Sequence, residues 1–186
     1  MYTQSEKKYM LGLARRAIEN YFKTGGALAV GQNELPSEAL AEKRSCFVTL
    51  RIAGRLRGCI GHLEAVQPLY ADIIDNAVSA AFGDYRFPRL SESEFKNTDI
   101  EVSVLKEPRP LAFSSPEDLL EKLRPDADGV ILKKGRRGAT YLPQVWKDLP
   151  DKGLFLSSLC EKAGLAPDEW KKPGIVIETY EVEVIG

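Results

Sequence analysis

An apolar stripe at helical spacing dominates the first part of the chain. Its members recur every three or four residues, with charged side chains mostly on the other side: Met10, Leu13, Ala14, Ala17, Ile18 and Tyr21. Ser5 is a suitable N-cap for this helix, and Gly25-Gly26 would end it. Residues 31–45 are expected to form a loop with a short helical turn after Pro36.

Two β-rich runs follow and meet at Ala53-Gly54, which predicts a β-hairpin. A second helix is expected after Pro68, with Gly83 as its left-handed cap. The core side of this helix would be formed by Leu69, Ile73, Ala77, Ala80 and Ala81. Residues 99–105 alternate as a strand, and the proline-rich residues 107–110 form a connector.

The second half of the chain repeats this order of elements. GVILKK and GATYLP flank a charged turn and predict a second hairpin, and IVIETYEVEVI alternates as a strand to Ile185. Between them, a helix is expected around Leu154, Phe155, Leu159 and Ala163. Hairpin, helix and strand therefore occur twice, at 46–105 and 129–185. This order predicts largely antiparallel sheets with flanking helices, an α+β fold.

Composition narrows the class of protein. The 186 residues carry 26 Lys+Arg and 27 Asp+Glu, and 44% are apolar, which excludes a low-complexity disordered chain. No window approaches ~20 uncharged apolar residues, so no membrane span is expected. The N-terminus lacks the layout of a signal peptide, and we expect a cytoplasmic protein. The net charge of −1 makes general nucleic-acid binding unlikely.

Cysteine and histidine positions give no metal or disulfide pattern. Cys46, Cys59 and Cys160 form no C-x-x-C pair and leave an odd cysteine, and His62 is the only histidine. We therefore expect reduced thiols and neither a metal nor another cofactor.

The register of the first hairpin decides which side chains share a face. A three-residue loop, 53–55, would place one apolar set together by pairing Ile52 with Leu56, Leu50 with Gly58 and Val48 with Ile60. The other face would then carry Thr49, Arg51, Arg57, Cys59 and Gly61, with Arg51 opposite Arg57. Two neighbouring cations suggest an anion or carboxylate close by.

Arg57 and Cys59 are the main candidates for chemistry. A neighbouring guanidinium stabilises a thiolate, the reactive form of cysteine. Glu101 and Ser103 share a face of the later strand, and Glu101 could lie near Arg57 either as its counter-ion or as a general base. The alternative for Cys59 is a small buried hydrophobe, the usual role of a free cysteine.

Gly58, Gly61 and His62 surround this pair. The glycines would let a ligand or another backbone approach closely, although glycine also marks bulges. His62 would be a base for Cys59 only if a bulge at Gly61 brought the two to the same face, because a straight strand places them on opposite faces.

The hexapeptide LRGCIG, Leu56 to Gly61, resembles the signature of the AMMECR domain family. Further segments in the same order are FVTL at 47–50, AAFGDYRFP at 80–88, EVSVL at 101–105, LPQVW at 142–146 and FLSSLCEKAGL at 155–165. The resemblance implies two unequal subdomains with a cleft, and we expect them within one domain, at 41–106 and at 1–40 plus 107–186. It further implies a bacterial branch associated with a Memo-type protein and a radical S-adenosylmethionine enzyme. No reaction follows from it, since the family's activity is not established.

Two further side chains are possible cleft residues. Arg86 follows a helix end and either lines the cleft or forms a cap or salt bridge, and Gln144 either lines the cleft or caps a short helix.

The leading hypothesis is an enzyme or enzyme component in which Cys59, with Arg57 and Glu101, acts on a small anionic substrate or modified group. Substrate binding would involve Gly58, Gly61, Thr49, Arg51, Arg86, Gln144 and Ser103. One alternative is a non-catalytic module that docks a Memo-type or radical-enzyme partner. A weaker one is an RNA-binding accessory factor that uses the basic turn at 133–137.

Overall fold

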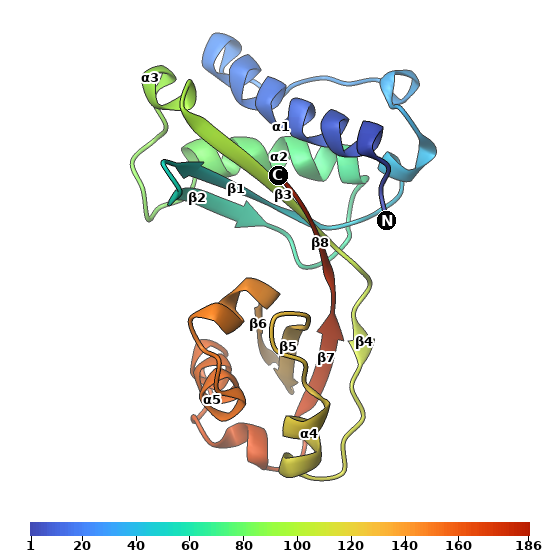
Figure 1. The fold of residues 1–186 in the computed structure, drawn as a ribbon, viewed down its shortest axis with the longest axis vertical. Helices are drawn as coiled ribbons and strands as arrows, with labels where there is room; N and C mark the ends of the chain where they lie inside the picture. Colours follow the sequence, from blue (N-terminus) through green and yellow to red (C-terminus); the bar gives the residue numbers. More distant parts are fainter. The chain divides into compact units, whose positions relative to one another are not determined.

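The computed structural model describes all 186 residues and divides them into two compact units (Figure 1). The first unit comprises Met1–Leu105 and Glu183–Gly186, and the second comprises Lys106–Val182. Residues 1–40 thus belong with the first hairpin, and not with 107–186 as expected. Residues 1–40 lie in the first unit because the N-terminal helix packs against the helix that follows this hairpin, in one hydrophobic core.

The first unit contains a four-stranded sheet in the order β2-β1-β3-β8. Its strands are β1 (Cys46–Ile52), β2 (Arg55–Gly61), β3 (Thr98–Leu105) and β8 (Val182–Ile185). β1 pairs antiparallel with both β2 and β3. The helices are α1 (Gln4–Thr24), α2 (Leu69–Phe82) and the short α3 (Glu92–Phe95), with 3-10 turns at Gln32–Glu34 and Glu38–Leu40.

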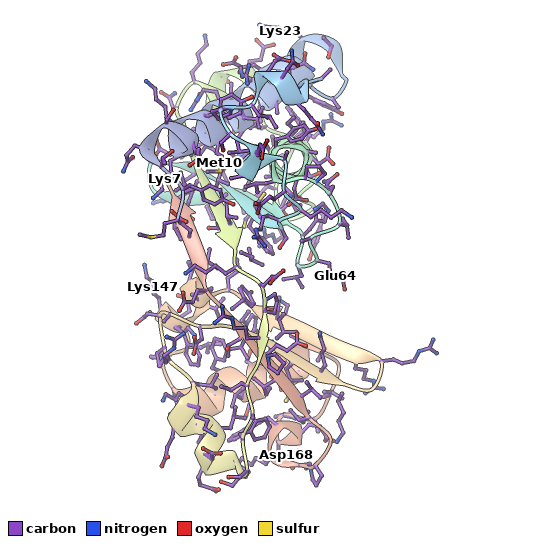
Figure 2. The ribbon with its side chains drawn as sticks, turned by 90° about the vertical axis from the view of Figure 1, so that its right-hand side faces the viewer. Lys7, Met10, Lys23, Glu64, Lys147 and Asp168 are labelled. Carbon is purple, nitrogen blue, oxygen red and sulfur yellow. The ribbon has the colours of Figure 1, made fainter.

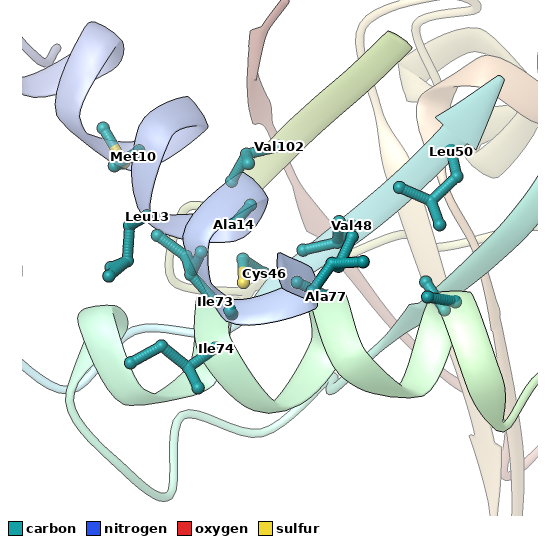
Figure 3. Packing of buried hydrophobic residues seen from close by; sticks show 14 of the residues in the cluster. Met10, Leu13, Ala14, Cys46, Val48, Leu50, Ile73, Ile74, Ala77 and Val102 are labelled. Carbon is teal, nitrogen blue, oxygen red and sulfur yellow. The ribbon is translucent and has the colours of Figure 1, made fainter. Parts of the chain in front are cut away.

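The core of this unit lies between the two long helices and one face of the sheet. Figure 3 shows Ala14 from α1 and Ile73 from α2 beside Val102 and Cys46 of the sheet, and all four side chains are fully buried. By contrast, Lys23 lies at the exposed end of α1 (Figure 2). Since side chains alternate along a strand, Thr49, Glu101 and Ser103 lie on the opposite face of the sheet, directed away from this core.

Two expected helix ends differ in the structure. The N-cap of α1 is Thr3, not Ser5, because Thr3 and Glu6 form a reciprocal capping box. Gly83 ends α2 with φ −118°, so the expected left-handed cap is wrong, whereas Gly25 does adopt the left-handed conformation at the end of α1.

The second unit has its own four-stranded sheet, in the order β4-β7-β5-β6. The strands are β4 (Arg109–Pro110), β5 (Gly129–Lys134), β6 (Arg137–Tyr141) and β7 (Val176–Tyr180). The helices are α4 (Pro116–Lys122) and α5 (Lys152–Lys162), with 3-10 turns at Pro143–Lys147 and Glu169–Lys171. Trp146 stacks on Phe155 at 3.6 Å between ring centroids and anchors a separate core.

The expected last strand is divided between the two sheets. IVIETYEVEVI forms β7 in the second unit and β8 in the first, interrupted at Glu181. The α+β class with largely antiparallel pairing is confirmed. No helix has the length and apolar character needed to cross a membrane.

Candidate functional site

The hexapeptide hairpin has a two-residue turn and a β-bulge. Ala53 and Gly54 both have positive φ, 48° and 76°, and Ile52 pairs with Arg55. The expected three-residue loop is therefore wrong. The register shifts after Leu50, so that Leu50 still faces Gly58 as expected. The bulge adds the residue that the shorter turn removes, and this preserves the apolar face.

The bulge separates Arg57 from Arg51, which faces Leu56 instead. Arg57 makes a bidentate ion pair with Glu94 of α3, at 2.9 Å from Nε to Oε1 and 3.1 Å from Nη2 to Oε2. This guanidinium and the backbone of Ser91 hold the pKa of Glu94 at about 2. Glu94, and not Glu101, is thus the counter-ion of Arg57, and the ion pair ties β2 to α3.

Cys59 lies on the face of the sheet that is directed away from the helical core. Its register partner on β1 is Thr49, whose Oγ1 donates to Sγ at 3.3 Å. On the other side of β1, Thr49 pairs with Glu101 of β3. Cys59, Thr49 and Glu101 therefore form a row across three strands. Ser103 pairs with Phe47, one step from Glu101 along the same face of β3.

Asp84 and Arg86 hold the backbone of Cys59 at the edge of the sheet. The Cys59 N–H donates to Asp84 Oδ2 at 2.9 Å, and Arg86 Nη2 donates to the Cys59 carbonyl at 3.0 Å. The two side chains also pair with each other, Nη2 to Oδ2 at 2.6 Å. Cys59 and Thr49 are thus a non-hydrogen-bonded pair, the type whose side chains come closest. Arg86 acts here as a salt-bridging residue that positions the cysteine.

The electrostatics at Cys59 differ from the expectation of a thiolate activated by Arg57. Burial raises the pKa of the Cys59 thiol, and the charges of Asp84 and Glu101 raise it further. The hydroxyl of Thr49 and the cation of Arg86 act in the opposite direction without reversing the result. The charge of Arg57 is neutralised by its ion pair with Glu94. The thiol is therefore protonated at neutral pH in the free protein.

The two glycines of the hexapeptide, Gly58 and Gly61, allow close packing within the first unit. A Cβ on Gly58 would lie 2.1 Å from the carbonyl oxygen of Ala80 in α2, and one on Gly61 would lie 2.3 Å from the ring of Phe47. Their lack of a side chain is explained by this packing. A direct role in substrate binding stays a prediction.

His62 points to the helix side of the sheet, away from Cys59. Its Nδ1 lies 2.6 Å from Oδ1 of Asp72 on α2, a carboxylate that is only 1% exposed. Asp72 also accepts hydrogen bonds from the Cys46 N–H and the Asn76 amide. A Cys59–His62 dyad is therefore absent, because the expected alternation holds through Gly61.

Arg51 and Glu101 line a separate groove at the edge of the first sheet. It has a volume of about 590 Å³, and its other wall is formed by Lys8, Leu11, Gly12 and Arg15 of α1. The residues of α1 were not expected in a site, although their helical spacing could have identified a common face. Gln144 belongs to the 3-10 turn Pro143–Lys147 of the second unit, and its place in a cleft stays a prediction.

The remaining site expectations concern metal and RNA. No group of three or more His, Cys, Asp or Glu side chains is arranged to hold a metal ion. At the basic turn of the second unit, Lys133 pairs with Glu178, Lys134 pairs with Glu169, and Arg137 donates to the carbonyl of Gly164. Most of the positive charge of this turn is therefore neutralised by acidic side chains or engaged by a backbone carbonyl of the second unit.

Comparison with known proteins gives the same family that the hexapeptide suggested. The AMMECR1 family pattern matches residues 11–185. Protein MK0488 of Methanopyrus kandleri is 39% identical over 190 residues, covering 98% of this chain and 88% of the relative. Protein MJ0810 of Methanocaldococcus jannaschii is 36% identical over 98% of this chain and 90% of its own length.

A solved structure shares the fold as well as the sequence. The crystal structure of the uncharacterized protein PH0010 from Pyrococcus horikoshii has a TM-score of 0.88 and 35% identity, covering 98% of this chain and 91% of that one. These three relatives are archaeal, and the expected bacterial branch stays a prediction. The match over nearly the whole chain shows that the protein belongs to the AMMECR1 family.

Proposed function

We propose that the protein is an enzyme or enzyme component in which the Cys59 thiol reacts with a small molecule or a modified group. One observation carries this proposal. Cys59 is half-buried on the face of the sheet directed away from the helical core, with the Thr49 hydroxyl on its sulfur and Glu101 beyond Thr49. A thiol, a hydroxyl and a carboxylate in one row are the groups that nucleophilic catalysis requires.

The raised pKa of Cys59 determines how such a reaction would proceed. The sulfur attacks a carbonyl carbon of the substrate and forms an S–C bond, the C=O π bond opens so that its electron pair moves to the oxygen, and the thiol proton passes to a base. Glu101 is the proposed acceptor of this proton, and the Thr49 hydroxyl stabilises the negative charge that develops on sulfur. Arg86 supplies positive charge on the other side of Cys59. Arg57 is proposed as a positioning residue that acts through Glu94.

The pH dependence of Cys59 alkylation tests the thiol directly. We expect the iodoacetamide rate at Cys59, followed by peptide mass spectrometry, to rise with a midpoint above the free-thiol value of about 8.5. Glu101→Gln should lower this midpoint because the carboxylate charge raises the pKa of Cys59. Asp99→Asn is the matched control, since Asp99 lies on the same face of β3 but is the register partner of Arg51, one step farther from Cys59 than Glu101 is.

The opposite outcome would support the alternative function. If Cys59 reacted slowly at every pH, nucleophilic catalysis would be excluded and the protein would be a docking module for a Memo-type or radical-enzyme partner. The observation that favours this alternative is apolar exposure beside the hexapeptide. Tyr85, between Asp84 and Arg86, is 94% exposed, and Leu56 is 39% exposed.

A further inference from the structure

We propose that the groove between α1 and the edge of the first sheet binds a zwitterionic ligand of the amino-acid type, either a free amino acid or a short peptide. This inference deepens the proposed function by naming a substrate class, and in that respect it rests on it. The binding site itself lies wholly within the first unit.

One face of α1 and the start of β3 form the two walls. Lys8, Leu11, Gly12 and Arg15 have the spacing i, i+3, i+4 and i+7, which places them on one side of the helix. Opposite them lie Asp99, Ile100 and Glu101 of β3, with Arg51 of β1 and Gly186 after β8. A groove of about 590 Å³ is within the usual range for small-molecule sites.

Charges of both signs face this groove without partners in the protein. Lys8 and Arg51 make no ion pair or side-chain hydrogen bond, and neither do Asp99 and Glu101. Arg51 and Glu101 are half-buried, whereas Lys8 and Asp99 are exposed. Two buried charges of the first unit, Arg57 and Asp84, have charged partners in Glu94 and Arg86. A ligand with a carboxylate and an ammonium group would satisfy both signs, whereas a ligand of one sign would meet repulsion from half of these groups.

Arg15 limits where the ligand can lie. Its Nη2 donates to the Thr98 carbonyl at 2.7 Å, and its guanidinium stacks on Phe95 at 5.0 Å from the ring centroid. The guanidinium of Arg15 is therefore already engaged within the protein. The unpaired charges of Lys8 and Arg51 are then the available cations for a ligand carboxylate.

The groove also has an apolar part of its lining. Leu11 and Ile100 are partly buried and pack on the core, so each presents an apolar side to the groove. Gly12 lies within α1, and a Cβ there would meet no atom within 4 Å. Glycine in a helix interior weakens the helix relative to alanine, and nothing in the protein's packing requires it at this position. Its effect is to keep space for an aliphatic side chain of the ligand.

Glu101 belongs both to the groove and to the row formed by Cys59, Thr49 and Glu101. It lines the groove and is also the register partner of Thr49, which in turn contacts Cys59. Neighbouring strands lie ~4.8 Å apart, so the backbones of Cys59 and Glu101 are separated by roughly 10 Å. A ligand of dipeptide length anchored in the groove could reach the sulfur.

Isothermal titration calorimetry with three probes tests the binding site. We expect saturable heat from L-leucine or L-leucyl-L-leucine and at least tenfold weaker binding of uncharged N-acetyl-L-leucine amide. Stronger binding of L-leucyl-L-leucine would indicate a peptide ligand, and stronger binding of L-leucine a free amino acid. The absence of saturable heat from both charged probes would overturn the proposal.

Variants of the groove separate binding from folding. Gly12→Leu should abolish binding while leaving the melting temperature unchanged or higher, because the new side chain enters open space on a helix. Lys8→Met combined with Arg51→Met should weaken binding at least tenfold, whereas Lys23→Met at the exposed end of α1 should not. Undiminished binding to Gly12→Leu would place the ligand elsewhere and refute the proposal.

Cys59→Ser distinguishes this inference from the proposed reaction. The variant should bind the charged probe as tightly as the unmodified protein does. If the charged probe binds but the Cys59 thiol is inert at every pH, the proposed reaction is refuted and the groove is still a binding site. A reactive Cys59 without binding would refute the groove alone.

Discussion

Replacing Gly58 by alanine is expected to destabilise the first unit by about 3 kcal/mol or more. The new Cβ would lie 2.1 Å from the backbone oxygen of Ala80 and 3.1 Å from its carbonyl carbon. Neither atom belongs to a flexible side chain, so the strand must move away from α2. This shift would also disturb the neighbouring Arg57–Glu94 ion pair. Urea unfolding followed by circular dichroism measures the loss.

Gly12→Ala is the matched control for this substitution. The same methyl group added at Gly12 meets no atom within 4 Å. Since alanine is a better helix former than glycine, the variant should gain about 0.5–1 kcal/mol of stability. Equal effects of the two substitutions would contradict the packing role assigned to Gly58.

Asp72→Ala is expected to cost about 3–4 kcal/mol of stability, because several donors would lose one acceptor. The carboxylate accepts the Cys46 N–H at 2.8 Å, the Asn76 amide at 2.9 Å and the Gln67 amide at 3.1 Å, and its Oδ1 also contacts His62. Cys46 and Asn76 are buried, so water cannot replace the lost acceptor at these two positions without opening the core.

Asp75→Ala controls for the loss of an acidic side chain from α2. Asp75 is exposed and accepts one hydrogen bond, from Gln67 at 2.9 Å. We expect a change within about 0.5 kcal/mol by chemical denaturation. A similar loss in both variants would mean that the charge on α2, and not the buried acceptor at Asp72, determines stability.

Local patterns in the sequence predicted the secondary structure well. The apolar stripes identified α1 and α2, and the alternating runs identified both hairpins, because burial of one face imposes these periods. The same reasoning failed for the last strand. Alternation continues through residues 175–185 and shows which side chains share a face, but it does not show that β7 and β8 pair with different sheets.

The sequence predicted only those features of the candidate site that depend on alternation along a strand. Strand alternation correctly placed Thr49 and Cys59 on one face, but the compensating turn and bulge left no clear signal in the sequence. Glu94 and Asp84 were missed as partners of the hexapeptide because they are 37 and 25 residues from Arg57 and Cys59. Such pairings depend on where α2 and α3 place the chain in space.

The rate of Cys59 alkylation with and without a ligand in the groove shows whether Cys59, Thr49, Glu101 and the α1 groove form one functional site in the first unit. Saturating L-leucyl-L-leucine should change the iodoacetamide rate at Cys59 at least threefold, and it should have no effect on Gly12→Leu. An unchanged rate with the ligand bound would contradict the account, because the groove and the thiol would then be independent.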